Sequence, residues 1–150
     1  MPSSAAGCFS PGRDILAVVR LFHITSEAEW RAAQASGEYR RRAFLREGFI
    51  HCSYARQVLR TADRIFRGVT GLVLLEIDPA RLTCGIVDEN LEGGTELFPH
   101  VYGLLPLSAV MAVHPFPCAT NGTFGPELLS RVDVEPDEVS VPRRVRFGIV

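Results

Sequence analysis

Three of the four histidines stand where a folded chain commonly presents side chains to a ligand. His23 and His51 lie toward the ends of predicted strands, and His100 lies in a predicted loop just after a glycine-rich stretch. Strand ends and the loops that follow them often carry binding and catalytic residues, and imidazole exchanges protons near neutral pH. This placement predicts one shared cleft with acid–base groups. The fourth histidine, His114, has no polar neighbours in the sequence and is interpreted as structural.

Glu89 is a carboxylate that could assist these histidines, because it opens the glycine-rich stretch that precedes His100. A carboxylate in this place can act as a general base or orient a ligand hydroxyl. Glu92 and Glu96 flank the same glycines and are alternatives, and all three could equally be solvated loop residues.

Cys52 and Ser53 are the nucleophilic side chains next to His51. Neither lies in a nucleophile-elbow sequence. Ser53 also precedes a helical pattern, where serine commonly caps the first turn of a helix. The sequence therefore leaves Ser53 with two interpretations, as a residue of the cleft and as a helix cap.

Metal chemistry is not predicted. Three neutral imidazoles can hold zinc, yet no two histidines are spaced as His-x-His or His-x-x-x-His, and no two cysteines as Cys-x-x-Cys. The four cysteines are interpreted as reduced thiols.

All 16 basic residues are arginine. Mechanisms that need a lysine, such as a Schiff base or a phosphate-loop lysine, are thereby excluded. Residues 1–75 carry 11 arginines against 6 acidic residues, whereas residues 76–150 carry 5 against 11. Because the guanidinium fork suits phosphate and carboxylate, the first half favours an anionic small-molecule ligand, with ordinary solvated faces as the alternative. The net charge of −1 and the acidic second half argue against nucleic acid.

Two aromatic side chains, Phe98 and Tyr102, flank His100 in a predicted loop. A loop gains nothing from exposing both of them unless they pack against something. Either this loop folds onto the core, or Phe98 and Tyr102 line an aromatic pocket.

The elements that must position these residues follow from hydrophobic periodicity, which predicts α+β packing around a bent sheet. Ser26 opens a capping-box pattern with Glu29, and Gly37 suits the left-handed end of a helix. Predicted helices span 27–35 and 54–67, and predicted strands span 16–24, 48–53, 71–78, 83–88 and 110–114.

One domain is expected at 15–116, with a loose leader at 1–14 and an extension at 117–150 that wraps the domain or stays mobile. No apolar run approaches the length of about 20 residues that crosses a bilayer, and the first residues do not resemble a secretory signal. We therefore expect a cytoplasmic protein that does not bind membranes. The oligomeric state is left open.

Four motifs occur in order along the chain: Leu21–Ile24 followed by Trp30, Gly48–Ser53 with Gln57, Glu89–Asn90 with Gly93–Gly94, and Phe98–Gly103. Over about residues 20–116 this pattern resembles a small bacterial family called domain of unknown function 952 (DUF952). That family is grouped with the ADP-ribosyltransferase superfamily. The resemblance implies an α+β fold in which a split, bent β-sheet and two main helices surround a cleft for NAD, as substrate rather than as a resident cofactor.

The resemblance also implies roles for individual residues. His23 resembles the histidine that holds the adenosine ribose, and His51 with Ser53 occupies the place where an aromatic residue packs on nicotinamide. Superfamily transferases carry a glutamate at the third position, where this chain offers His100, Glu89 or Glu96. The residues predicted to bind substrate are Ser53, Phe98, Tyr102, Trp30, Gly48 and Arg56.

These features predict a small enzyme, of transferase or glycohydrolase type, that binds an anionic, nucleotide-like ligand such as NAD. Its catalytic candidates are His23, His51, His100 and Glu89. Two alternatives stay open. One is a metabolic enzyme that uses the histidines for acid–base chemistry on a small metabolite, and the other is a non-catalytic ligand-binding module.

Overall fold

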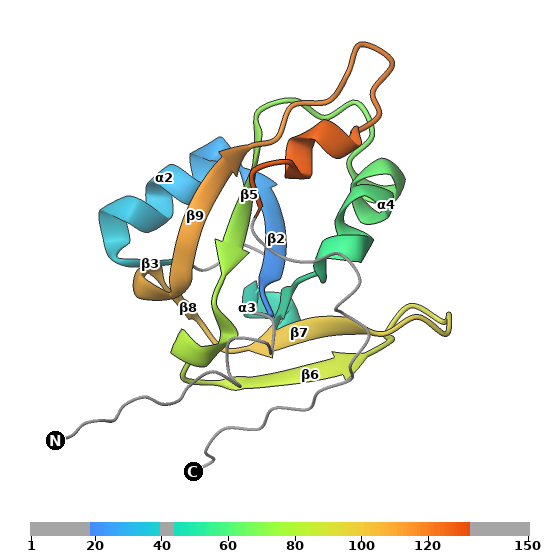
Figure 1. The fold of residues 1–150 in the computed structure, drawn as a ribbon. Helices are drawn as coiled ribbons and strands as arrows, with labels where there is room; N and C mark the ends of the chain where they lie inside the picture. The colour runs from blue at the N-terminus through green and yellow to red at the C-terminus, as the bar shows by residue number, and fades with distance from the viewer. Residues whose placement is uncertain (1–18, 40–43, 133–150) are drawn as a thin grey trace, which may run out of the picture.

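The computed structural model describes residues 19–39 and 44–132, which fold into short antiparallel strands covered by two longer helices (Figure 1). The α+β class is confirmed. The leader at 1–14, the arginine cluster at 40–42 and the chain after residue 132 lie outside the described residues. The helices are α2 (Glu27–Ser36), α3 (Phe44–Glu47) and α4 (Ala55–Ile65), with 3-10 turns at Pro79–Arg81, Leu107–Ala109 and Pro126–Leu129.

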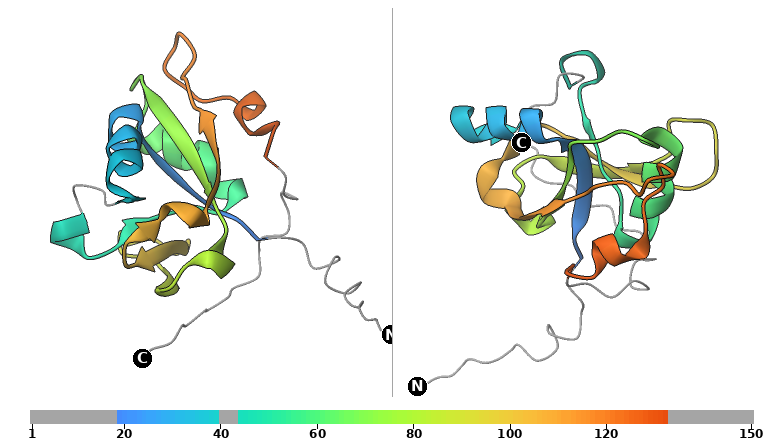
Figure 2. Two further views of the ribbon diagram at one scale, coloured as in Figure 1. Left: turned by 90° about the vertical axis from the view of Figure 1, so that its left-hand side faces the viewer. Right: turned by 90° about the horizontal axis from the view of Figure 1, so that it is seen from above.

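A three-stranded antiparallel sheet in the order β2-β5-β9 forms the centre, from β2 (Leu21–Ser26), β5 (Leu72–Ile77) and β9 (Val110–Pro115). Helices α2 and α4 lie on its opposite faces (Figures 1 and 2). Every residue of β5 is buried. A strand covered on both faces needs apolar side chains at successive positions, which explains why its sequence is a continuous apolar run interrupted only by Glu76.

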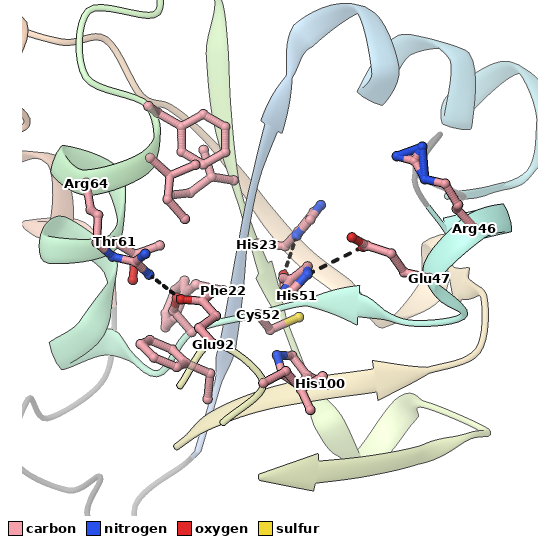
Figure 3. Close-up of a pocket in the computed structure, with 16 residues that line it drawn as sticks. Phe22, His23, Arg46, Glu47, His51, Cys52, Thr61, Arg64, Glu92 and His100 are labelled. Carbon is pink, nitrogen blue, oxygen red and sulfur yellow. Dashed lines mark hydrogen bonds and ion pairs between the residues drawn. The ribbon is translucent and has the colours of Figure 1, made fainter. Parts of the chain in front are cut away.

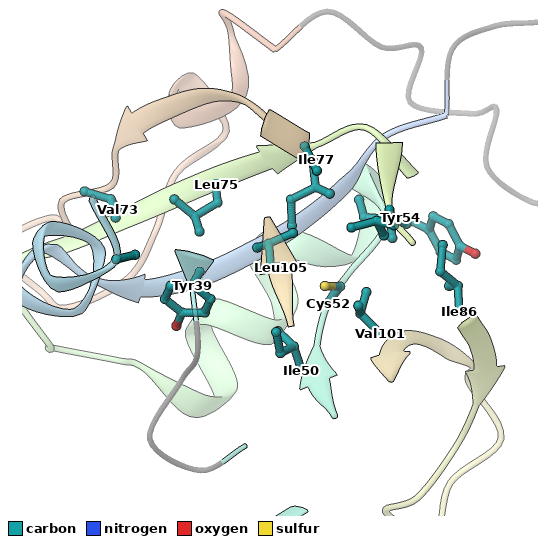
Figure 4. Packing of buried hydrophobic residues seen from close by; sticks show 14 residues of the cluster. Tyr39, Ile50, Cys52, Tyr54, Val73, Leu75, Ile77, Ile86, Val101 and Leu105 are labelled. Atoms are coloured by element: carbon teal, nitrogen blue, oxygen red, sulfur yellow. The ribbon is translucent and has the colours of Figure 1, made fainter. Parts of the chain in front are cut away.

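A second sheet has the order β4-β7-β6, from β4 (Ile50–His51), β7 (Phe98–Tyr102) and β6 (Gly85–Glu89), and β3 (Glu38–Tyr39) pairs with β8 (Leu105–Pro106). His100 therefore lies in a strand, and the expected loop at this position is wrong. The reason is that β7 pairs with β4 on one side, through His100 and Val101, and with β6 on the other. Side chains alternate along these strands, so one face carries Ile50, Ile86 and Val101 into the core (Figure 4).

The two sheets meet at a single bridge. The N–H of Phe22 on β2 donates to the carbonyl of Ser53, and the N–H of Ser53 donates to the carbonyl of Phe22, both at 2.8 Å. Away from this point β2 and β4 are not paired as strands in the described chain. The result is a sheet that is split between these two strands.

The ends of the helices confirm one predicted cap and correct another. Ser26 Oγ accepts from the Glu29 N–H at 3.0 Å, and Gly37 ends α2 with a φ of 96°. The expected cap at Ser53 is wrong, because the main chain of Ser53 bonds to β2 and Tyr54 takes the N-cap position of α4. The Tyr54 N–H donates instead to Gln57 Oε1 at 2.9 Å.

Residues after Phe116 continue to pack on the core. The rings of Phe116 and Phe124 stack with centroids 5.0 Å apart, and the Phe124 N–H donates to Asp63 Oδ1 on α4 at 2.9 Å. The described part of the expected extension thus covers α4 as far as Val132. Among the described helices, none is long and apolar enough to cross a membrane.

Candidate functional site

A cavity of about 350 Å³ opens beside the split between the sheets (Figure 3). It extends from α4 on one side, past the histidines of β2, β4 and β7, to α3 on the other. His23, His51 and His100 all line it, so the three histidines do share one cleft. Its lining is completed by charged, polar and apolar residues: Phe22, Ile24, Arg46, Glu47, Cys52, Ser53, Thr61, Arg64, Ile65, Phe66, Leu91, Glu92 and Phe98.

His51 and His100 face each other across β4 and β7. They are register partners, and their ring centroids lie 4.9 Å apart at 89°. The Cys52 N–H donates to the Pro99 carbonyl at 3.0 Å. Because hydrogen-bonded and non-hydrogen-bonded pairs alternate along antiparallel strands, His51 and His100 form a non-hydrogen-bonded pair, in which the side chains approach closely.

His100 is held by a carboxylate on the adjacent strand. Its Nδ1 donates to Glu89 Oε2 at 2.9 Å, and the Tyr102 hydroxyl donates to the same oxygen. Partial burial raises the pKa of the Glu89 carboxyl, but these two hydrogen bonds lower it by more, so its pKa lies below the usual range. Burial and the adjacent Glu89 raise the pKa of Tyr102 to about 12. Glu89 is therefore a carboxylate and Tyr102 a neutral donor at physiological pH.

Two polar atoms at the cavity are buried without a partner. Because Nδ1 of His100 donates to Glu89, the neutral ring has a bare Nε2, and this nitrogen has no hydrogen-bond partner among the residues that the structure describes. The Ser53 hydroxyl likewise has none within the described chain. The two residues are only 3% and 6% exposed.

His51 on β4 and Phe49 just before it contact further polar and aromatic side chains. His51 Nε2 lies 3.4 Å from Glu47 Oε1. The Phe49 ring contacts His51, His100 and Tyr102 with centroid separations of 4.8, 4.7 and 5.2 Å. The Phe49 ring thus holds the two facing imidazoles at their outer edge.

His23 is engaged through both ring nitrogens. Nδ1 lies 2.6 Å from the His51 carbonyl oxygen, and Nε2 lies 2.9 Å from the Tyr39 hydroxyl. The ring therefore forms part of the cavity wall, while its polar atoms bond within the protein.

Cationic groups stand at both ends of the cavity. Arg64 on α4 pairs with Glu92 at 3.1 Å. Arg46 on α3 is exposed and has no ion pair with any residue of the described chain. Arg46 is thus the arginine at this cavity whose charge is open to an anionic ligand.

Several predicted residues lie elsewhere. Trp30 packs on the core from α2, and Gly48, at φ 82°, forms the turn before β4. Arg56 lies 3.6 Å from Glu96, whose carboxylate also accepts from Gln57 and Arg60. Burial raises the pKa of Glu96, but these hydrogen bonds and the charges of Arg60 and Arg56 together lower it by more, so its pKa lies below the usual range. This cluster fastens the β6–β7 loop to α4 and leaves Arg56 outside the cavity lining.

Other residues of the site were missed by sequence reasoning. Arg46 and Glu47 belong to a short helix with no periodicity of its own, which ends at Glu47, so the sequence offers no helical spacing that links Glu47 to His51 on β4. Burial, and then the nearby Cys84, raise the pKa of the Cys52 thiol, which keeps it protonated and unreactive. In the described chain, no three His, Cys, Asp or Glu side chains are grouped as a metal site would need.

His114 does have polar company. Its Nε2 lies 2.9 Å from Glu76 Oε1 on β5, and Glu76 Oε2 accepts from Arg20 at 3.3 Å. The expectation of an isolated histidine is wrong because these partners are brought next to it by strand pairing across β5 and β9.

The chain is similar to one protein family and to solved structures of one bacterial protein. A family model described as "Protein of unknown function (DUF952)" matches residues 24–113. The crystal structure of protein CC0527 from Caulobacter crescentus is 33% identical, with a TM-score of 0.63, and the match covers 75% of this chain and 96% of that chain. The solution NMR structure of the same protein is 34% identical, with a TM-score of 0.63 and coverages of 76% and 97%. No curated protein matches the chain.

Proposed function

The chain belongs to the DUF952 family of proteins of unknown function, and on that premise we propose that it is an enzyme for a small anionic, nucleotide-like ligand. The ligand occupies the cavity at the split of the sheet, and His100 is its acid–base group. Glu89 orients the His100 ring and stabilises its protonated form.

One observation carries this proposal: two buried residues that line one cavity, His100 and Ser53, each have a polar side-chain atom, Nε2 and Oγ, without a partner in the described chain. Native proteins satisfy nearly all buried polar groups, because leaving one unpaired costs about 1–3 kcal/mol. His114, by contrast, binds a buried carboxylate and does not line this cavity. A ligand that bonds to both atoms removes this cost.

The chemistry of the pair follows from its hydrogen bonds. A histidine whose Nδ1–H is held by a carboxylate presents a basic Nε2. In the reaction we propose, this nitrogen takes the proton of a water or hydroxyl as that oxygen attacks the anomeric carbon of the ligand's ribose. The N-glycosidic bond breaks and its electron pair leaves with the base, which for NAD is neutral nicotinamide. The imidazolium that forms is paired with Glu89, whose lowered pKa keeps it negative.

An anionic ligand is favoured by Arg46, at the α3 end of the cavity. Apolar side chains line the α4 end, among them Phe22, Ile65 and Phe98. The volume of about 350 Å³ is near the lower limit of about 300–1,000 Å³ for small-molecule sites. We therefore propose that only part of a dinucleotide enters, with a phosphate outside near Arg46.

NAD is the first ligand to test. The ADP-ribosyltransferase resemblance implies a split sheet around the ligand, and the separation of β2 from β4 beyond the Phe22–Ser53 bridge supports this assignment. The glutamate expected in superfamily transferases would correspond here to Glu89, acting through His100.

The test is proton NMR of NAD with the full chain, following ligand line broadening and free nicotinamide together. We expect broadening with the wild type and with His100→Gln, but nicotinamide release only with the wild type. His114→Gln is the matched control and should behave as the wild type. Nicotinamide released equally by His100→Gln would refute the role of His100. An absence of broadening would refute NAD and favour a smaller metabolite, whereas broadening without product in any sample would favour a binding module.

A further inference from the structure

A chain of buried hydrogen bonds links the cavity wall to helix α2. It begins at the His51 carbonyl, which lies 2.6 Å from His23 Nδ1, and continues from His23 Nε2 to the Tyr39 hydroxyl at 2.9 Å. The Tyr39 hydroxyl lies 2.8 Å from Thr25 Oγ1 and 3.2 Å from Glu29 Oε1. His23, Thr25 and Tyr39 are all buried, so this chain crosses the interior from β4 to α2.

The direction of the first hydrogen bond is fixed by its acceptor. A carbonyl oxygen can only accept, so Nδ1 of His23 carries a proton. In the neutral ring, Nε2 then accepts from Tyr39. In the protonated ring, Nε2 donates to Tyr39, whose own proton turns to Thr25 or Glu29. A rotation of the Tyr39 hydroxyl thus keeps the His23–Tyr39 hydrogen bond in either charge state.

The His23 side chain lies where a further main-chain contact between β2 and β4 would be. His51 forms a non-hydrogen-bonded pair with His100, so its main-chain carbonyl points away from β7. Two residues further on, Ser53 also turns its main chain away from β7 and bonds to Phe22 of β2. At His51 the strands have separated, and the His23 side chain spans the gap that a strand would fill.

We propose that His23 and Tyr39 are positioning residues that set the width of the split and thereby place the His51 ring. This inference rests on the proposed function for its effect on ligand binding, but not for its structural part. In the described chain, His51 is also held by its pairing with β7, by Glu47 and by the Phe49 ring. Among the described residues, the charged and titratable groups that face His23 include Glu29 and Tyr39 on one side, and His51, His100, Arg46 and Glu47 around the cavity.

The diagnostic variant is Tyr39→Phe, which removes one hydroxyl and keeps the ring. The expected signature is a change in the NMR shifts of His23 Nε2 and of the His51 carbonyl carbon, because the first loses its partner and the second loses a fixed donor. The affinity for NAD should fall about two- to tenfold, the usual effect of one hydrogen bond. Tyr54→Phe is the matched control, because the buried Tyr54 hydroxyl bonds to Asp88 on the second sheet.

The outcomes separate the two proposals. If the wild type does not bind NAD, the proposed ligand is wrong, while the shifts of His23 and His51 still decide the positioning role. If Tyr39→Phe leaves both shifts where Tyr54→Phe leaves them, the positioning role is wrong. Should Tyr39→Phe fail to fold, Glu29→Gln replaces it, with Glu38→Gln as control, and the same two shifts are expected to move.

Discussion

Two histidine–glutamate pairs of this protein have the same hydrogen-bond length, through Nδ1 of His100 and Nε2 of His114, and different surroundings. In each, a ring nitrogen lies 2.9 Å from a carboxylate oxygen of the neighbouring strand. Around His114, both oxygens of Glu76 are used, by His114 and by Arg20. Around His100, the ring borders the cavity and its Nε2 is unpartnered in the described chain. His114 Nδ1 has no hydrogen-bond partner in the described chain either, but His114 does not line that cavity. The pair alone therefore does not mark a site; its place beside a cavity does.

The largest expected effect is that of substituting Glu89. We expect Glu89→Gln to lower turnover about 10²- to 10⁴-fold, the usual contribution of acid–base catalysis, because the ring loses its charged partner. The measurement is nicotinamide release from NAD under single-turnover conditions. Glu76→Gln is the control and should retain the wild-type rate. Equal losses in both variants would show that the pairs do not differ in function.

Glu76 should show the opposite effect, on stability. Glu76 is buried, whereas the side chains of Arg20 and His114 are 19% and 13% exposed, and Arg20 also lies 3.6 Å from Asp78. Glu76→Ala removes their common acceptor, and we expect a cost of about 1–3 kcal/mol, which urea unfolding at neutral pH would measure. NAD binding by the folded fraction should be unchanged. A cost no greater than that of Glu89→Ala would contradict a purely structural role for the second pair.

The contribution of Arg46 to binding an anionic ligand is the next expected effect. Arg46→Gln should weaken NAD binding about three- to tenfold at low salt, and the salt dependence should decrease, because a charge at the rim acts over a screened distance. Titration at two ionic strengths measures both. Arg31→Gln, which alters an exposed i,i+4 pair with Glu27, should leave the affinity unchanged. A salt dependence that survives in Arg46→Gln would place the anion elsewhere.

The smallest expected effect concerns Tyr102. The folded-state pKa of Glu89 is below its ordinary value of 4.5, so this carboxyl stabilises the fold above that pH, and the contribution is lost as the pH falls through the lowered pKa. Tyr102→Phe removes one of the two donors and should cost less than about 1 kcal/mol at pH 7. Urea unfolding at pH 7 and near pH 3 is the check, since the difference should close in acid. A difference that persists in acid would point to lost packing instead.

Local signals were readable from the sequence and distant ones were not. Ser26 and Gly37 end α2 as predicted, because a cap depends on atoms within about one turn. The apolar run of β5 was predicted for a similar reason. Ser53 shows the limit: its local sequence fits a helix cap, but a hydrogen-bonded bridge to Phe22, 31 positions earlier, takes its main chain.

The candidate site divides in the same way. That His23, His51 and His100 share one cleft was predicted from their places near strand ends and is confirmed. Their partners were only partly found. Glu89 was named, whereas the hydroxyl of Tyr39 and the carboxylate of Glu76 reach histidines through strand pairing and helix packing that no local pattern encodes.

Amide hydrogen exchange at the bridge between Phe22 and Ser53 should also report on the opening of the two sheets. Two amide protons, one on each residue, are held by the pair of 2.8 Å hydrogen bonds that joins the sheets. Each can exchange with solvent only when the strands come apart there. Because the cavity lies directly beside this point, the exchange rates of these two amides report how often the sheets separate. If both amides exchange through the same opening, a ligand that touches both sheets should slow the two by the same factor.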